Sequence, residues 1–157
     1  MDTNVAVVAN GEHPEADLDC VQACIDSLIE IRERYCVLMD DLHLIWEEYR
    51  RRLRPSGQPG PGDAFFKWLW DNQGNERHCR HVTITPDVTR DFGEFPEDPA
   101  LERFDRKDRK FVAVVLASGE RPPVLNAVDT DWWEYRAALK AHGVTVRFLC
   151  PQNMRDR

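Results

Sequence analysis

The stretch "VLNAVDTDWWEYRAALKAHGVTVRFLC" (Val124–Cys150) decides the fold class of this chain. It opens with the short apolar run Val124–Val128, which is typical of a buried strand. A helical segment follows and closes on Gly143, and the apolar run Val144–Cys150 then predicts a second strand. A strand, a helix and a further strand in this order favour a parallel pair joined by a crossover.

Further segments repeat this alternation along the chain. We expect strands over Val5–Ala9, Tyr35–Met39 and His81–Thr85, and helices over Pro14–Arg34, Asp40–Leu53, Asp63–Gln73 and Phe111–Ser118. Phe111–Ser118 is valine-rich and also suits a strand, but an aspartate ahead of it and Gly119 behind it favour a helix. The order predicts an α/β fold, a three-layer α/β/α Rossmann-like domain over residues 1–157 with a mostly parallel central sheet.

The composition places the chain among ordinary globular proteins. Hydrophobic residues make up 42% of the 157 residues, and no apolar run approaches the roughly 20 residues of a membrane span. The amino terminus lacks a basic segment of the secretory type, so we expect a cytoplasmic protein without membrane contact. The five cysteines are odd in number and lie mostly in apolar segments, which indicates reduced thiols. A zinc site from Cys20, Cys24 and "HCRH" (His78–His81) matches no standard spacing.

Basic residues gather in two short segments although the net charge is −7. Tyr49–Arg54 holds four arginines and Arg103–Lys110 holds five basic residues, so nine of the 21 lysines and arginines lie there. An acidic chain can therefore still offer a basic rim to a polyanion such as RNA or single-stranded nucleic acid. The alternative is that both segments are solvated helix faces.

Acidic side chains follow several of the predicted strands or begin the helices. Asp129 and Asp131 come directly after Val124–Val128, where an α/β sheet keeps its binding sites. Asp105 and Asp108 precede the helix that begins near Phe111, and Glu48 lies in the second helix. Carboxylates that converge repel one another unless a divalent cation neutralises them, and Mg²⁺ or Mn²⁺ prefers such oxygen ligands. The sequence therefore predicts a metal site.

Each acid also has an ordinary structural explanation. Asp105 can cap the helix that begins near Phe111, with Asp108 as an acid of its first turn that favours the helix dipole, and Asp131 can cap the helix that follows it. Glu48 can pair with Arg51 on a solvated helix face. Taken singly these explanations are the more common ones, so the prediction of a metal site depends on the acids meeting in one place.

Three motifs together resemble the PIN-domain nucleases, a Rossmann-like family of metal-dependent phosphodiesterases. "IWEEYRRRL" resembles the family's second-acid helix and carries that acid onto Glu48. "FDRKDRKFVAVVLAS" is similar to its third-acid helix, which implies Asp108 with Asp105 as an accessory. "LNAVDTDWW" is similar to its fourth-acid strand end, which implies Asp129 with Asp131 as an auxiliary acid.

The first position of the resemblance departs from the family. The family places an aspartate after its first strand, whereas this chain has "VAVVANG", with Asn10 at that place. An amide oxygen can bind a cation but contributes no charge. A variant of lower metal affinity, an inactivated binding module and an engineered substitution all explain Asn10 equally well.

The resemblance implies hydrolysis of nucleic acid that leaves 5′-phosphate and 3′-hydroxyl ends. Glu48, Asp108 and Asp129 would hold Mg²⁺ or Mn²⁺, with Asn10 and Asp131 completing the site. From charge alone, the residues expected to guide the nucleic-acid backbone are Arg50, Arg51, Arg109 and Lys110. The leading hypothesis is a metal-dependent nuclease of toxin or defence type that acts on RNA or single-stranded nucleic acid, compatible with an antitoxin-like or regulatory protein partner and with a homodimer. The alternative is a catalytically silent binding subunit. A small-molecule phosphohydrolase is disfavoured because the chain lacks a "DxDxT" motif and a glycine-rich phosphate loop.

Overall fold

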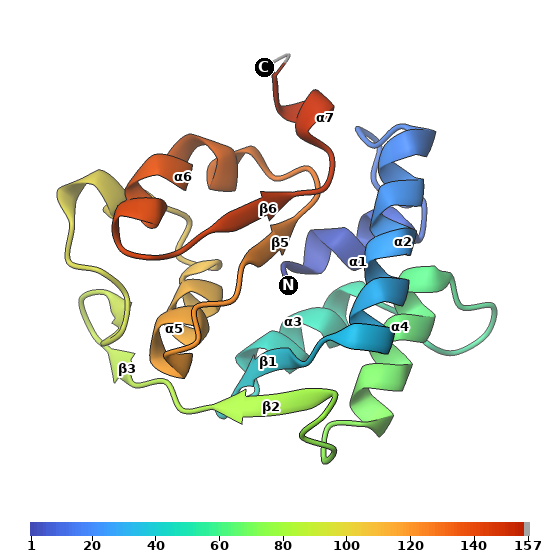
Figure 1. Cartoon of the computed structure of the whole chain (residues 1–157), viewed down its shortest axis with the longest axis horizontal. Helices are drawn as coiled ribbons and strands as arrows, with labels where there is room; N and C mark the ends of the chain where they lie inside the picture. Colours follow the sequence, from blue (N-terminus) through green and yellow to red (C-terminus); the bar gives the residue numbers. More distant parts are fainter. Residues whose placement is uncertain (156–157) are drawn as a thin grey trace.

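The computed structural model describes residues 1–155 as a mixed α/β fold of helices and short strands (Figure 1). In chain order these are α1 (Thr3–Ala9), α2 (Leu18–Arg34), β1 (Val37–Asp40), α3 (Leu44–Arg52), α4 (Pro61–Asp71), β2 (Cys79–Val82), β3 (Pro86–Asp87), β4 (Asp91–Phe92), the 3-10 turn η1 (Pro99–Leu101), α5 (Arg109–Ser118), β5 (Val124–Asn126), α6 (Thr130–Ala141), β6 (Val146–Phe148) and α7 (Pro151–Arg155). The predicted α/β class is confirmed.

The strands form two parallel pairs. β1 pairs with β2, with Val37 opposite Cys79, and β5 pairs with β6, with Val124 opposite Val146. The short strands β3 and β4 form a separate antiparallel pair. The amino terminus lies between β5 and α3, in the middle of the molecule (Figure 1). The prediction of parallel strands is therefore confirmed for both pairs, and the first four residues of the chain lie where the two pairs approach each other.

The prediction of a first strand over Val5–Ala9 is wrong, because these residues form most of helix α1. Asp2 adopts an extended backbone and accepts a hydrogen bond from the Asn4 amide, which is the geometry of a helix N-cap. Val5–Ala9 is buried on all sides. A short apolar run that is buried all round carries no periodicity, so its composition cannot distinguish a helix from a strand. Asn10 consequently ends a helix.

Most other elements form where the sequence predicts them. Helix α5 confirms the helical interpretation of the valine-rich run, and Gly119 closes it with a φ of 73°. Helix α2 begins at Leu18, later than predicted, because the Asp17 side chain accepts from the Cys20 amide and starts the helix there. Asp40, which is fully buried, caps α3 through the amides of Leu44 and Ile45.

The cysteines differ from the prediction of reduced thiols. Cys20 at the start of α2 forms a disulfide with Cys150 ahead of α7, across a sequence separation of 130. Cys24 and Cys79 are free and buried, and Cys36 is free and exposed. Cys24 lies beside this disulfide and is the one free thiol of the three clustered cysteines, and this cluster includes no histidine. Only one sulfur of the cluster is therefore a thiol that could bind a metal. The thiols therefore no longer argue for a reducing compartment.

None of the helices found within residues 1–155 combines the length and the apolar content that a bilayer span requires.

Helices α1 and α4 approach each other closely at Gly62. A Cβ atom placed on Gly62 would lie 2.0 Å from the backbone oxygen of Ala6, so a larger residue would push the two helices apart. We expect Gly62→Ala to lower the free energy of unfolding by about 3 kcal/mol through this overpacking. Urea unfolding monitored by tryptophan fluorescence measures the change.

The matched control is Gly74→Ala. A Cβ atom placed on Gly74 would have no heavy atom within 4 Å, and the backbone there is not left-handed, so the free energy of unfolding should change by less than about 0.5 kcal/mol. Equal stability of the two variants would contradict the close approach of α1 and α4.

Candidate metal centre

Three carboxylates from distant parts of the chain meet in one place. Asp2, Asp108 and Asp129 each offer an oxygen atom, and these atoms all lie within 4.8 Å of one another. Asp2 and Asp108 are buried, with exposed fractions of 4% and 6%. The predicted convergence of Asp108 and Asp129 is therefore present, and Asp2 joins them.

Asp2 is held by the elements on either side of it. Its Oδ1 accepts from the Asn4 amide at 2.9 Å and its Oδ2 accepts from the Trp132 indole nitrogen of α6 at 2.7 Å. Its backbone amide donates to the Leu125 carbonyl of β5. The start of α1 and the end of β5 thus fix Asp2 from two directions.

Asp108 and Asp129 both lie at helix starts. Asp129 is the N-cap of α6, and its Oδ1 accepts from the Asp131 amide at 2.9 Å. Asp108, and not Asp105 as expected, stands at the N-cap position of α5, and its side chain makes no capping hydrogen bond. The fully buried Asn126 side chain donates to the Asp129 carbonyl oxygen and accepts from the Asn4 side chain, which fixes the turn after β5.

Glu48 of α3 lies beside this cluster but is already engaged. The Thr3 hydroxyl donates to its Oε1 at 2.6 Å, and the buried Lys110 ammonium forms an ion pair with its Oε2. Glu48 is therefore not one of the three carboxylates that converge most closely. Asp2, Glu48, Asp108 and Asp129 together place four carboxyl groups in this region, beside the buried Lys110 ammonium and the buried amino group of Met1.

Asp105 and Asp131 contribute to the architecture around the cluster. The Asp105 amide donates to Asp131 Oδ2 at 2.8 Å, which holds the turn ahead of α5 against the start of α6. Asp105 is exposed and lines the cleft in front of the cluster. Asp131 is half-buried in the first turn of α6; the N-cap considered for it is Asp129 instead.

Asn10 does not belong to the site, contrary to the prediction. It ends α1, where its Oδ1 accepts from the amides of Gly62 and Asp63 and its Nδ2 donates to Asp63 Oδ1. The error follows from the wrong first strand, since the acid was sought after Val5–Ala9. Asp2 precedes this helix, and the pattern Asp2–Thr3–Asn4 ahead of an apolar run is an N-cap signal that could have identified it.

Two of the four basic residues expected to guide nucleic acid are buried in structural roles. Arg109 donates to the Glu102 carbonyl at 2.7 Å and pairs with Asp91, with its guanidinium 4.5 Å from the centre of the Phe95 ring. Lys110 is engaged with Glu48 as described above. Arg50 is exposed and pairs with Glu47 of its own helix, whereas the exposed Arg51 lines the cleft in front of the acids. Of the four residues expected to guide the nucleic-acid backbone, Arg51 is therefore the one whose exposed position in the cleft suits that role best.

The cluster lies in a cleft with a volume of about 830 Å³. Its walls carry the acids together with five lysine and arginine side chains, Arg51, Arg52, Arg106, Lys107 and Lys110. Arg106 is occupied by Asp91, to which it donates at 2.5 Å. The cleft thus has an acidic floor and a basic rim.

Burial and mutual repulsion raise the pKa values of the clustered acids. Burial, opposed by hydrogen bonds and reinforced by Asp129 and Glu48, raises the pKa of Asp2 to about 6. Burial and the charges of Asp2 and Asp129 raise the pKa of Asp108 to about 9. Burial also raises the pKa of Asp129. The protein therefore holds protons on this cluster at pH values where free aspartates have lost them.

The donor set fits a hard divalent cation. All three converging ligands are carboxylate oxygens, which Mg²⁺ and Mn²⁺ prefer, and no cysteine or histidine is among them. A cation there would relieve the repulsion that raises the pKa values. No protein-family model, curated protein or solved structure matches this chain, so the argument for the site depends on this geometry.

The raised pKa values predict a pH-dependent stability. Above about pH 4 the unfolded chain has lost the Asp108 proton, whereas the folded protein keeps it until the pH exceeds its raised pKa of about 9. The folded state therefore binds more protons than the unfolded state between these limits, and this group makes stability fall as pH rises. This group lowers the free energy of unfolding by up to about 1.4 kcal/mol for each pH unit of increase. We expect Asp108→Asn to abolish this contribution.

Chemical unfolding of both proteins in EDTA between pH 5 and pH 8 measures this effect. The relevant quantity is the difference between variant and wild type, because the amino group of Met1, whose pKa burial lowers to about 6, contributes the opposite trend in both proteins. A difference in stability that does not grow with pH would contradict the raised pKa of Asp108.

Proposed function

We propose that this chain is a metal-dependent nuclease of the PIN type that hydrolyses RNA or single-stranded nucleic acid in the acidic cleft. The observation that carries the proposal is the convergence of Asp2, Asp108 and Asp129 to within 4.8 Å of one another. Three buried or half-buried acids from separate elements have no mutual hydrogen bonds to explain their proximity, whereas a shared cation explains it.

The resemblance to PIN-domain nucleases is more complete with Asp2 at its first position. Asp2, Glu48, Asp108 and Asp129 then supply carboxylates for all four acids, in the order of the family. The parallel pairs β1–β2 and β5–β6 support a Rossmann-like arrangement, and Asp129 follows the carboxyl end of β5. Because Asn10 lies outside the cleft, the main sequence argument for a catalytically silent subunit no longer applies.

The residues of the cleft divide into clear roles under this proposal. Asp2, Asp108 and Asp129 would hold Mg²⁺ or Mn²⁺, which when bound makes a water more acidic and stabilises charge on a phosphodiester. Thr3 and Lys110 orient Glu48 at the edge of the cluster. Asp131 and Asn126 fix the turns that carry Asp108 and Asp129. The expected products carry 5′-phosphate and 3′-hydroxyl ends.

The shape and charge of the cleft favour an extended polyanion as substrate. The cleft is large and open, with Arg51, Arg52 and Lys107 exposed on its rim. Phosphates of a single strand can contact these side chains while one phosphodiester reaches the acids. The rim therefore supports nucleic acid over a small phosphate ester.

Metal binding and cleavage should depend on the same carboxylates. We expect Asp2→Asn and Asp129→Asn to lower Mn²⁺-dependent cleavage of a labelled RNA by at least about 100-fold, because each removes a charged ligand worth several kcal/mol in the transition state. Mn²⁺ should raise the melting temperature of the wild type and not of these variants. Gel analysis of the RNA and differential scanning fluorimetry are the two measurements.

Asp19→Asn is the matched control, since Asp19 is an exposed acid of α2 outside the cleft. It should leave both readouts unchanged, and EDTA should abolish cleavage by the wild type. A wild type that binds Mn²⁺ and yet leaves RNA and single-stranded DNA intact would refute the nuclease and favour the silent binding subunit.

The basic rim should act on binding more than on chemistry. We expect Arg51→Ala to weaken RNA binding, measured by fluorescence anisotropy with Asp129→Asn as background, and to reduce the slope of log affinity against log salt by about 0.7 to 1. Arg50→Ala is the matched control, because Arg50 pairs with Glu47 and does not line the cleft. Equal effects of the two substitutions would show that general charge, and not the cleft rim, binds the RNA.

A further inference from the structure

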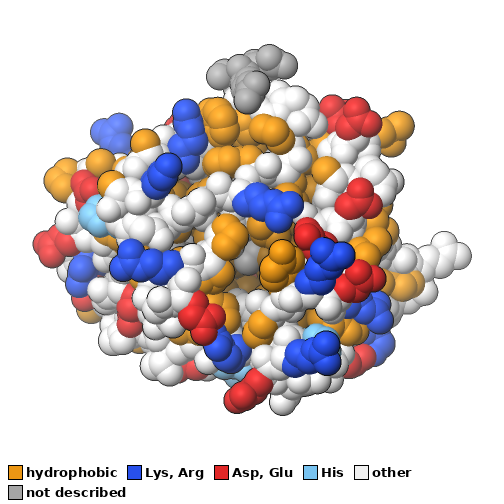
Figure 2. Space-filling model, in the orientation of Figure 1, with side chains coloured by type: hydrophobic (Ala, Val, Ile, Leu, Met, Phe, Trp, Pro, Cys, Tyr) orange, Lys and Arg blue, Asp and Glu red, His pale blue; other side chains and the backbone are white. Residues whose placement is uncertain are grey.

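A second cavity separates the two parallel strand pairs. It has a volume of about 360 Å³ and lies between β1 and β5, on the other side of Met1 from the acidic cleft. Figure 2 shows hydrophobic side chains gathered around a hollow in the middle of this face. We call it the apolar slot, and its lining includes Ile31, Tyr35, Leu38, Phe111, Val115 and Leu125.

The strands on both sides of the slot expose an unpaired edge. Among residues 1–155, β1 has only β2 as a neighbour and β5 has only β6. The Val37 amide donates to the His78 carbonyl next to β2, and the Val124 amide donates to the Thr145 carbonyl next to β6. Since successive peptide groups point to opposite edges of a strand, the peptide groups of Leu38 and Leu125 point away from these partners. The Leu38 peptide groups on one edge and the Leu125 amide on the other therefore flank one apolar space, while the Leu125 carbonyl accepts from the Asp2 amide.

The first residues of the chain already follow the edge of β5. The Asp2 amide donates to the Leu125 carbonyl at 3.0 Å, and the Asn4 side chain accepts from the Ala127 amide at 2.8 Å. Residues 2 to 4 thus advance along β5 in its own direction. Extended backwards from Met1, the same path passes Val124 and enters the slot, which Met1 itself lines.

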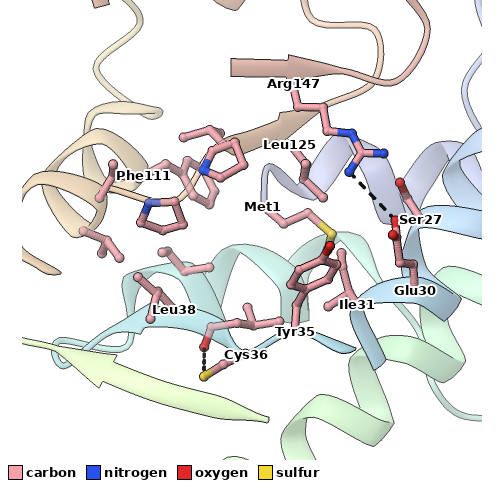
Figure 3. A pocket seen from close by; sticks show the side chains of 17 residues that line it. Met1, Ser27, Glu30, Ile31, Tyr35, Cys36, Leu38, Phe111, Leu125 and Arg147 are labelled. Atoms are coloured by element: carbon pink, nitrogen blue, oxygen red, sulfur yellow. Dashed lines mark hydrogen bonds and ion pairs between the residues drawn. The ribbon is translucent and has the colours of Figure 1, made fainter. Parts of the chain in front are cut away.

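The walls of the slot are apolar on both sides. Phe111 lies on one side, and Ile31 and Tyr35 lie on the other (Figure 3). A strand enclosed in this way must be apolar on both of its faces, as the inner strands of parallel sheets are. The ion pair between Glu30 and Arg147, at 3.8 Å, lies at the rim.

We propose that an extended apolar strand of about four residues, joined by a peptide bond to Met1 and parallel to β5, fills the apolar slot and pairs with both β1 and β5. Its peptide groups would meet the amide and carbonyl of Leu38 on one edge, and one of its carbonyl groups would accept from the Leu125 amide on the other, next to the existing bond from Asp2 to the Leu125 carbonyl. The occupant is polypeptide directly ahead of Met1, since the path of residues 1 to 4 leads out of the slot without a break.

This strand would join the two pairs into a single five-stranded parallel sheet, in the order β2, β1, new strand, β5, β6. Asp2 would then lie at the carboxyl end of the central strand, where sheets of this kind bind their ligands. The inference stands without the proposed function, because its tests measure pairing and stability and not cleavage.

The test adds residues to the full chain. One variant carries Lys-Val-Leu-Val-Val directly ahead of Met1 after an initiating methionine, and the matched control carries Lys-Gly-Ser-Gly-Ser. We expect the apolar extension to raise the melting temperature by roughly 5 °C or more relative to the control. Amide hydrogen exchange at Leu38 and Leu125 should slow at least about tenfold, because both amides gain partners.

Three results would overturn the inference. The first is equal melting temperature and equal amide exchange in the two extended proteins. The second is slow exchange at Leu38 and Leu125 in the chain without an extension, which would show that these edges are already satisfied and which needs no new variant to fold. The third is an equal rise in the melting temperature of the unextended chain when the separate peptide acetyl-Lys-Val-Leu-Val-Val-amide is added at equimolar concentration. A strand joined to Met1 has a far higher effective concentration than a free peptide, so the free peptide should have a much smaller effect.

Discussion

The first two residues join the two halves of the molecule, because they form hydrogen bonds with α3 on one side and with β5 and α6 on the other. Met1 accepts a hydrogen bond at its carbonyl from the buried Tyr49 hydroxyl of α3, and Asp2 contacts Leu125 and Trp132 on the side of β5 and α6. Buried polar groups must be paired, so each of these contacts is obligatory and directional. The same contacts that join the halves place one carboxylate at the centre of the protein.

That placement makes the candidate site a costly feature of the fold. A buried carboxylate next to two others is disfavoured in its charged form, and the raised pKa values of Asp2 and Asp108 express this cost. Lys110 offsets part of the charge through Glu48. Sites that bind cations commonly accept such a cost, since the metal supplies the missing positive charge.

Local chemistry decided which parts of this fold could be predicted from sequence. Helix α5 was predictable, although its composition suits a strand, because Gly119 marks its end. The segment Val5–Ala9 was not, because a short run buried on every side has no periodicity. Because a strand was expected there, the first acid was sought after it, which led to Asn10 and missed Asp2. The convergence of Asp108 and Asp129 was predictable from their places beside a helix and a strand. The burial of Arg109 was not, because charge alone does not reveal the carbonyl groups that a guanidinium will meet in the folded chain.

The disulfide between Cys20 and Cys150 closes most of the polypeptide into a ring. Peptide-bond cleavage within this ring, for example in the exposed stretch 54–60, opens the ring without releasing a fragment. The protein with a single cut in this stretch stays one covalent molecule until the disulfide is reduced, so its two fragments would separate on a gel under reducing conditions alone.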